Sequence, residues 1–125
     1  RWNSPGTRAV YCAGSVSLAT LEMLVHLPGS ALLPSYRLIE IEIPDSMIEL
    51  LDASLLPRDW TRSPAPPRLP DLGDEWISSR RSVALRVPSA VVPMESNFLL
   101  NPNHPDFHKL AIGTPRHYPL DPRLI

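Results

Sequence analysis

The sequence predicts one α+β domain with a mostly antiparallel sheet. Residues 37–43 and 82–87 alternate between apolar and polar side chains, as strands with one buried face do. Between and before them, apolar residues recur at helical spacing. The 16 prolines keep every element short, because proline interrupts helices and central strands. A length of 125 residues, 43% of them hydrophobic, suits a single core, so we treat 1–125 as one domain.

The first elements are a loop, a strand and a helix. Residues 1–8 contain a Pro5–Gly6 turn signal, and the apolar run 9–13 predicts a short buried strand. Ser15 is suited to cap the helix that follows. Apolar residues three and four apart along 17–26 predict one buried helical face. That face comprises Leu18, Leu21, Leu24 and Val25.

The middle of the chain predicts a strand and a second short helix. Strict alternation makes 37–43 the clearest strand, with three isoleucines on its core face. Ser46 and Glu49 have the spacing of a capping box, which predicts a helix over 47–53. The proline-rich segment 57–70 is expected to be a loop.

The last third predicts one helix and several strands. Residues 71–80 are expected to form a short helix around Trp76, and 82–87 a strand. Segments 90–92 and 98–100 are predicted as further short strands.

Composition excludes several functional classes. The net charge of −1 gives no basic excess for a phosphate-tracking surface, so we expect no nucleic-acid partner. No apolar run reaches the length of a transmembrane helix, so no membrane partner is expected. Cys12 is the only cysteine, which excludes an intrachain disulfide and favours a reducing compartment, the cytoplasm.

Short motifs are uninformative. The chain has no glycine-rich dinucleotide fingerprint, P-loop, nucleophile elbow or HExxH motif, so any NAD is not bound in the Rossmann manner. His104 and His108 have a spacing that zinc can use, but Pro105 follows the first at once and no third ligand is near. We therefore expect no metal.

Two long blocks carry a family resemblance. The first joins 1–7 (RWNSPGT), 10–11 and 17–26; the second joins 86–93 (RVPSAVVP), 95–102 and 104–107. Both resemble the RES domain, which is named for its Arg, Glu and Ser. Residues 59–60 and 64–66 look like that family's central loop, and 121–124 like its terminal strand. The resemblance covers nearly the whole chain in the expected order.

The resemblance implies a fold and an activity. Its fold is similar to that of ADP-ribosyltransferases: a split mixed sheet with short helices around a cleft that holds NAD⁺. Members of the family resemble toxins that cleave the nicotinamide–ribose bond of NAD⁺ by hydrolysis or phosphorolysis. Their usual partner is an Xre-like antitoxin that covers the cleft, and homo-oligomers within the complex are allowed. The family carries a strand or more ahead of the Arg that stands here as Arg1, so we expect one or two amino-terminal strands to be missing.

Two alternatives stay open beside NAD⁺ consumption. One is a protein ADP-ribosyltransferase, which keeps the bond cleavage and changes the acceptor. The other is an inactive, truncated RES module that only binds its antitoxin.

The resemblance assigns roles to three residues of the first block. Arg1 is expected to grip the pyrophosphate, because a guanidinium binds oxyanions bidentately; the alternative is a solvated loop arginine. Tyr11 is expected to stack on nicotinamide or bond a ribose hydroxyl, or else to pack in the core. Glu22 is expected to orient the ribose, stabilise the developing cation or activate water; the alternative is an exposed pair with His26.

The second block supplies the remaining candidates. Ser89 is expected to bond the nicotinamide amide or a ribose oxygen, with an ordinary turn serine as the alternative. Asn101 and Asn97 are expected to shape the same cleft, although a turn at Pro102 explains Asn101 equally well. The catalytic set is therefore Arg1, Glu22 and Ser89, and the NAD-binding set is Arg1, Tyr11, Ser89 and Asn101. Arg8 is a further candidate for a phosphate contact.

Overall fold

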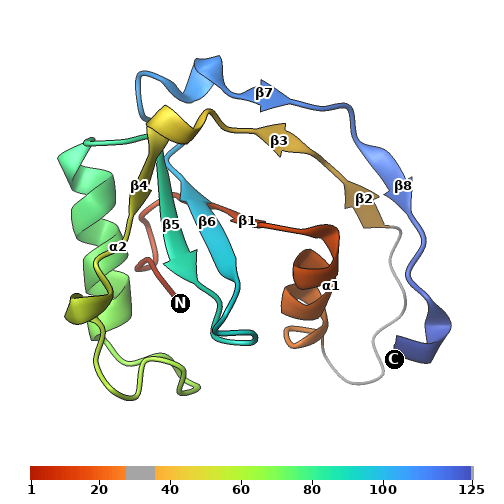
Figure 1. Ribbon diagram of the computed structural model, residues 1–125, viewed down its shortest axis with the longest axis horizontal. Coiled ribbons are helices and arrows are strands. Elements are labelled where there is room, and N and C mark those ends of the chain that lie inside the picture. Colours follow the sequence, from red (N-terminus) through yellow and green to blue (C-terminus); the bar gives the residue numbers. More distant parts are fainter. Residues whose placement is uncertain (28–35, 125) are drawn as a thin grey trace.

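A four-stranded mixed sheet forms the centre of the computed structural model, which describes residues 1–27 and 36–124 (Figure 1). The strand order is β1-β6-β5-β4. Neighbours β1/β6 and β6/β5 are antiparallel, whereas β5/β4 is parallel. The α+β class with a mixed sheet is thus confirmed. The strands are β1 (Val10–Ala13), β4 (Ile48–Leu50), β5 (Ala84–Pro88) and β6 (Ser96–Leu100).

Helix α2 (Arg68–Ser79) covers one face of this sheet and forms the main core with it. Its buried residues recur at helical spacing, which gives the helix one apolar side. Trp76 is buried there, and its indole N–H donates to Ser82 Oγ at 2.8 Å, so the ring's polar atom is satisfied. The core consists of Trp2, Leu69, Trp76, Leu85, Val87 and Leu99.

The amino-terminal loop is anchored on α2. Trp2 is buried, and a Cβ added at Gly73 would lie 1.5 Å from the Trp2 carbonyl oxygen. Only glycine lets the helix and the loop backbone approach so closely. The Ser4 backbone N–H also donates to Asp74 Oδ1 at 2.9 Å. Residues 1–4 are therefore held by the same helix that builds the core.

Two small antiparallel pairs extend from the sheet as a curved ribbon, which we call the arm (36–42 and 111–118; Figure 1). Strand β2 (Tyr36–Leu38) pairs with β8 (Arg116–Tyr118), and β3 (Ile41–Glu42) with β7 (Ala111–Ile112). A second, smaller core lies where the arm meets the sheet. It consists of Val83, Ala84, Leu100 and Leu110, with Ile41, Ile43, Ile48 and Phe107 among the residues packed against it.

Helix α1 (Val16–Leu24) follows β1 directly. Ser15 caps it as predicted, since its hydroxyl accepts from the Leu18 N–H at 3.1 Å. The predicted buried face is wrong: of its four residues only Leu18 is buried, while Leu21 and Val25 are 41% and 59% exposed. One side of the helix therefore packs against the protein, and the opposite side is exposed. Thr20 Oγ1 lies 2.6 Å from the Tyr118 hydroxyl and ties α1 to the arm.

Two predictions for the middle of the chain are wrong. The expected helix over 47–53 is instead a 3₁₀ turn (Asp45–Met47), strand β4 and a second 3₁₀ turn (Ala53–Leu55), because β5 offers β4 a parallel partner. The expected single strand over 37–43 is split into β2 and β3, each with its own partner. Ile39 lies between them and is 47% exposed, so it is not on a core face.

The last third matches the prediction in part. The helix around Trp76 and the strands at 82–87 and 98–100 are confirmed as α2, β5 and β6. Residues 90–92 are a turn and not a strand, and the tail ends in a 3₁₀ helix (Pro122–Leu124), like the short one at Phe107–Lys109. Over 1–27 and 36–124, no helix is long and apolar enough to cross a membrane.

Candidate active site

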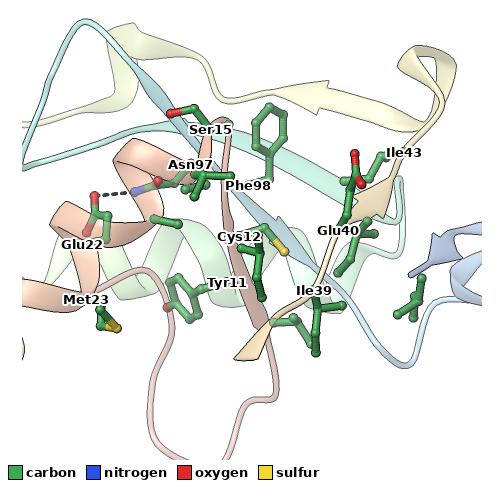
Figure 2. Close-up of a pocket in the computed structure, with 18 of the residues that line it drawn as sticks. Tyr11, Cys12, Ser15, Glu22, Met23, Ile39, Glu40, Ile43, Asn97 and Phe98 are labelled. Carbon is green, nitrogen blue, oxygen red and sulfur yellow. Dashed lines mark hydrogen bonds between the residues drawn. The ribbon is translucent and has the colours of Figure 1, made fainter. Parts of the chain in front are cut away.

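A cavity of about 1430 Å³ lies around β1, between α1 and the arm (Figure 2). Side chains from three elements reach it. Tyr11 and Cys12 come from β1, Glu22 and Met23 from α1, and Ile39 and Glu40 from the arm. Its surface is mostly apolar, with the polar groups concentrated at a few points. Such a lining is typical of ligand sites.

Glu22 lies on α1 at the inner edge of this cavity and is held by two donors (Figure 2 shows one). The Ser89 hydroxyl donates to Glu22 Oε1 at 2.6 Å, and Asn97 Nδ2 donates to the same oxygen at 2.7 Å. Both bonds are short, as hydrogen bonds to a charged acceptor are. Helix α1, the turn after β5 and strand β6 thus converge on one carboxylate.

Ser89 lies behind Glu22 and is completely buried. It follows β5 and begins the turn to β6, where the N–H groups of Val91 and Val92 donate to its Oγ at 3.1 and 3.0 Å. Because its oxygen accepts two N–H groups, its proton is directed to Glu22. Ser89 is not among the residues that line the cavity, so the expected direct contact with nicotinamide or ribose has no support in this geometry.

Tyr11 borders the cavity with its ring and uses its hydroxyl internally. The hydroxyl accepts from the Trp2 backbone N–H at 3.2 Å and donates to Asn3 Oδ1. Partial burial raises the pKa of Tyr11, so the phenol keeps its proton near neutral pH. Of the two roles expected from the sequence, stacking is the one this arrangement leaves free.

Arg1 lines the same cavity as Glu22. Its Nη1 donates to the carbonyl oxygens of Trp60 and Arg62, at 3.0 and 3.1 Å, both in the proline-rich loop. Those carbonyls fix the guanidinium from one side. Nε and Nη2 are not used in these two bonds.

Asn101 lies away from the cavity. Its side chain donates to the Ile77 carbonyl at 3.3 Å and accepts from the Asn103 N–H at 3.0 Å, which locks the turn after β6 against α2. It is buried and structural, so the turn alternative describes it. Arg8 is not among the residues lining the cavity either.

The two histidines considered for zinc bond to the backbone. His104 Nε2 lies 3.0 Å from the Arg80 carbonyl, and His108 Nδ1 lies 2.7 Å from that of Pro105. No cluster of three metal-ligating side chains occurs within the parts of the chain that the structure describes.

The structure adds cavity residues that sequence reasoning missed. Arg37 and Arg116 line it from the arm, and Cys12 lies on β1 with a thiol whose pKa is raised by burial. Nothing local in the sequence marks them, because they join the cavity wall only through the pairing of β2 with β8, which sets Arg37 opposite His117 and Leu38 opposite Arg116. Asn97 was named only as a residue shaping the cleft; its bond to Glu22 depends on the tertiary fold.

Comparison with known proteins decides the family. The model of the RES domain matches residues 1–121. This chain belongs to the RES domain family. The resemblance expected from the two sequence blocks is therefore confirmed, and it extends from Arg1 through the arm to the final turn.

Similar RES proteins carry toxin names. "Toxin Res" of Yersinia enterocolitica is 47% identical over 125 residues, covering 99% of this chain and 82% of that protein. "Toxin Res" of Photorhabdus laumondii is 44% identical over 127 residues, with 100% and 81% covered. "Prs ADP-ribosylating toxin" of a Sphingobium strain is 40% identical over 128 residues, with 100% and 80% covered. The RES chain described here is thus similar to toxins over its whole length.

Proposed function

We propose that this RES chain is a toxin that consumes NAD⁺ by cleaving its nicotinamide–ribose bond. One observation carries the proposal: a carboxylate, Glu22, stands at the edge of a large cavity that also holds the Arg1 guanidinium. The cavity, at about 1430 Å³, exceeds the roughly 300–1,000 Å³ of pockets for drug-sized ligands. This volume supports a substrate as large as NAD⁺.

Each of the three cavity residues has a separate role in the proposed reaction. Arg1, backed by two carbonyls, binds the pyrophosphate through its free N–H groups. The ring of Tyr11 stacks on a planar base. Glu22 Oε2, the oxygen not used by Ser89 and Asn97, faces the ribose and stabilises positive charge as it develops there. No metal is needed for these roles.

The reaction balances with water as the acceptor. The bond between ribose C1′ and the pyridinium nitrogen breaks, and its electron pair stays with nicotinamide, which leaves neutral. The water oxygen bonds to C1′ and releases one proton, for which Glu22 is the nearest base in the proposed arrangement. The products are ADP-ribose, nicotinamide and H⁺. With phosphate as the acceptor, a phosphate oxygen forms the new bond instead.

Substituting Glu22 tests the proposal. Glu22→Gln keeps the size of the side chain and removes its charge, so we expect nicotinamide release from NAD⁺ to fall by roughly 10²- to 10⁴-fold. Glu40→Gln is the matched control, because Glu40 also lines the cavity but from the arm, and its side chain is largely exposed. That variant should stay within about twofold of the parent. Equal rates for Glu22→Gln and the parent, both folded, contradict the proposal.

Protein ADP-ribosylation is the second candidate, favoured by the name of the Sphingobium relative. It keeps the same bond cleavage and gives ADP-ribose to a protein side chain. NAD⁺ labelled in its adenylate half separates the two: label in small molecules indicates hydrolysis or phosphorolysis, and label in protein indicates transfer. Adding phosphate then separates water from phosphate as the acceptor.

We further propose a cytoplasmic setting and an Xre-like antitoxin that covers the cavity. The toxin names of the relatives support a toxin–antitoxin context. Leu21 and Val25 are exposed on α1, the helix that carries Glu22, and offer apolar surface for a partner. Co-expression of the antitoxin should restore growth, and Val25→Asp should weaken the complex without changing nicotinamide release by the free toxin.

A further inference from the structure

The Glu22 carboxylate depends on a residue that neither the RES name nor a short motif marks. We infer that Asn97 is a positioning residue, whose amide N–H holds Glu22 Oε1 so that Oε2 is turned to the substrate. This inference rests on the proposed function of Glu22. It follows from three features of the described residues: the identity of the donor, the shared acceptor atom and an unpaired buried oxygen.

The donor's identity fixes the orientation of the Asn97 amide. Glu22 Oε1 accepts a hydrogen bond from the Ser89 hydroxyl, and a carboxylate oxygen has no proton of its own to donate. The amide must therefore present its N–H₂ group, and it does so at 2.7 Å (Figure 2). The reverse orientation would set two acceptor oxygens against each other.

The shared acceptor atom fixes Glu22. Ser89 approaches Oε1 from the turn after β5, and Asn97 approaches it from β6. Two donors from separate elements hold this oxygen at one position. A single donor would leave the carboxylate free to rotate about the one remaining hydrogen bond. Because Ser89 and Asn97 both donate to Oε1, Oε2 is the oxygen that remains for a molecule in the cavity.

The unpaired oxygen shows that this arrangement costs stability. Asn97 Oδ1 is buried and has no hydrogen-bond partner among the described residues. A buried acceptor without a donor is destabilising, and natural proteins keep few of them. An apolar side chain of similar size would avoid the cost, so packing does not explain an asparagine here. The bond from Nδ2 to Glu22 does.

Steady-state kinetics test the role. Asn97→Ala removes the donor, so we expect kcat for nicotinamide release to fall about 10- to 100-fold, the worth of one hydrogen bond to a charged group. KM for NAD⁺ should change by less than about threefold, because the residue acts through Glu22. Asn103→Ala, the same change at an exposed position outside the cavity, is the control. Unchanged kcat, or a change confined to KM, overturns the inference.

Stability gives an independent reading. Asn97→Leu removes the donor and the unpaired oxygen together, so its midpoint of thermal unfolding should equal or exceed that of the parent while kcat falls. A residue with a merely structural role would lose stability instead.

The inference and the proposed function can fail separately. If the parent protein releases no nicotinamide, the proposed function fails, and the NMR signal of the Asn97 side-chain amide still reports on the contact. That signal should be displaced from the usual amide range and should move in Glu22→Ala but not in Glu40→Ala. An Asn97 signal insensitive to Glu22→Ala overturns the inference.

Discussion

The two sides of the central sheet are built differently. On the α2 side, six buried apolar residues form a continuous core, and the central strands β5 and β6 have five residues each. The arm has pairs of only two or three residues, and Ile39 and Ile112 on it are about half exposed. The partners of Glu22 are Asn97 on β6 and Ser89 in the turn after β5, whereas the arm lines the cavity from the other side. A fixed carboxylate thus faces a lightly packed wall.

Substitutions at two glycines should give the largest difference in stability between the two sides. In Gly73→Ala the new Cβ would lie 1.5 Å from the Trp2 carbonyl oxygen, which is a backbone atom. We therefore expect the free energy of unfolding to fall by about 3 kcal/mol or more. In Gly113→Ala, on the arm, the nearest atom is the Glu40 carbonyl oxygen at 3.1 Å, and the arm can yield. That variant should lose less than about 1 kcal/mol. Urea unfolding measures both; equal losses would show that the two sides are equally rigid.

Truncated apolar residues give the next largest difference. Leu99, on β6, is fully buried, so Leu99→Ala should cost about 2–5 kcal/mol. Ile112 is 55% exposed on the arm, and Ile112→Ala should cost below about 1 kcal/mol. Urea unfolding of both variants measures these losses, provided that their m-values equal that of the parent protein. A large loss for Ile112→Ala would mean that the arm buries more in solution than its exposure indicates.

The surface ion pairs beside α2 give the smallest effect. Arg81 bonds Glu75 on α2 at 2.8 Å and Glu49 on β4 at 3.1 Å, but all three side chains are substantially exposed. Arg81→Met should cost below about 1 kcal/mol, and less at high salt. The hydrogen bond from Arg81 lowers the pKa of Glu75. The contribution is therefore present near neutral pH and is lost as pH falls below about 4.

Local signals predicted the main elements of the well-packed side and the cap of α1. The Ser15 cap, the helix around Trp76 and strands β5 and β6 each depend on spacing or alternation within a few residues, and all four are in the structure. Their local preferences agree with the tertiary fold, which is why sequence reasoning found them.

Elements that depend on distant partners were predicted poorly. The Ser46–Glu49 pair has capping-box spacing, yet pairing with β5 makes 48–50 a strand. Alternation over 37–43 is real, but β7 and β8 divide it into two strands. At the site, Arg1, Tyr11 and Glu22 were placed together by family resemblance, whereas the burial of Ser89 and the contact from Asn97 depend on the turn between β5 and β6. Pattern within a segment does not contain that information.

The close approach of Trp2 to Gly73 has a thermodynamic consequence. The loop that ends in Arg1 is clamped to α2 through Trp2 and through the bond from Ser4 to Asp74. If Arg1 binds an anion as proposed, and only when the loop is docked, linkage stabilises the docked state by RT ln(1 + [L]/Kd). Occupancy at the guanidinium and resistance of α2 to opening should therefore rise and fall together.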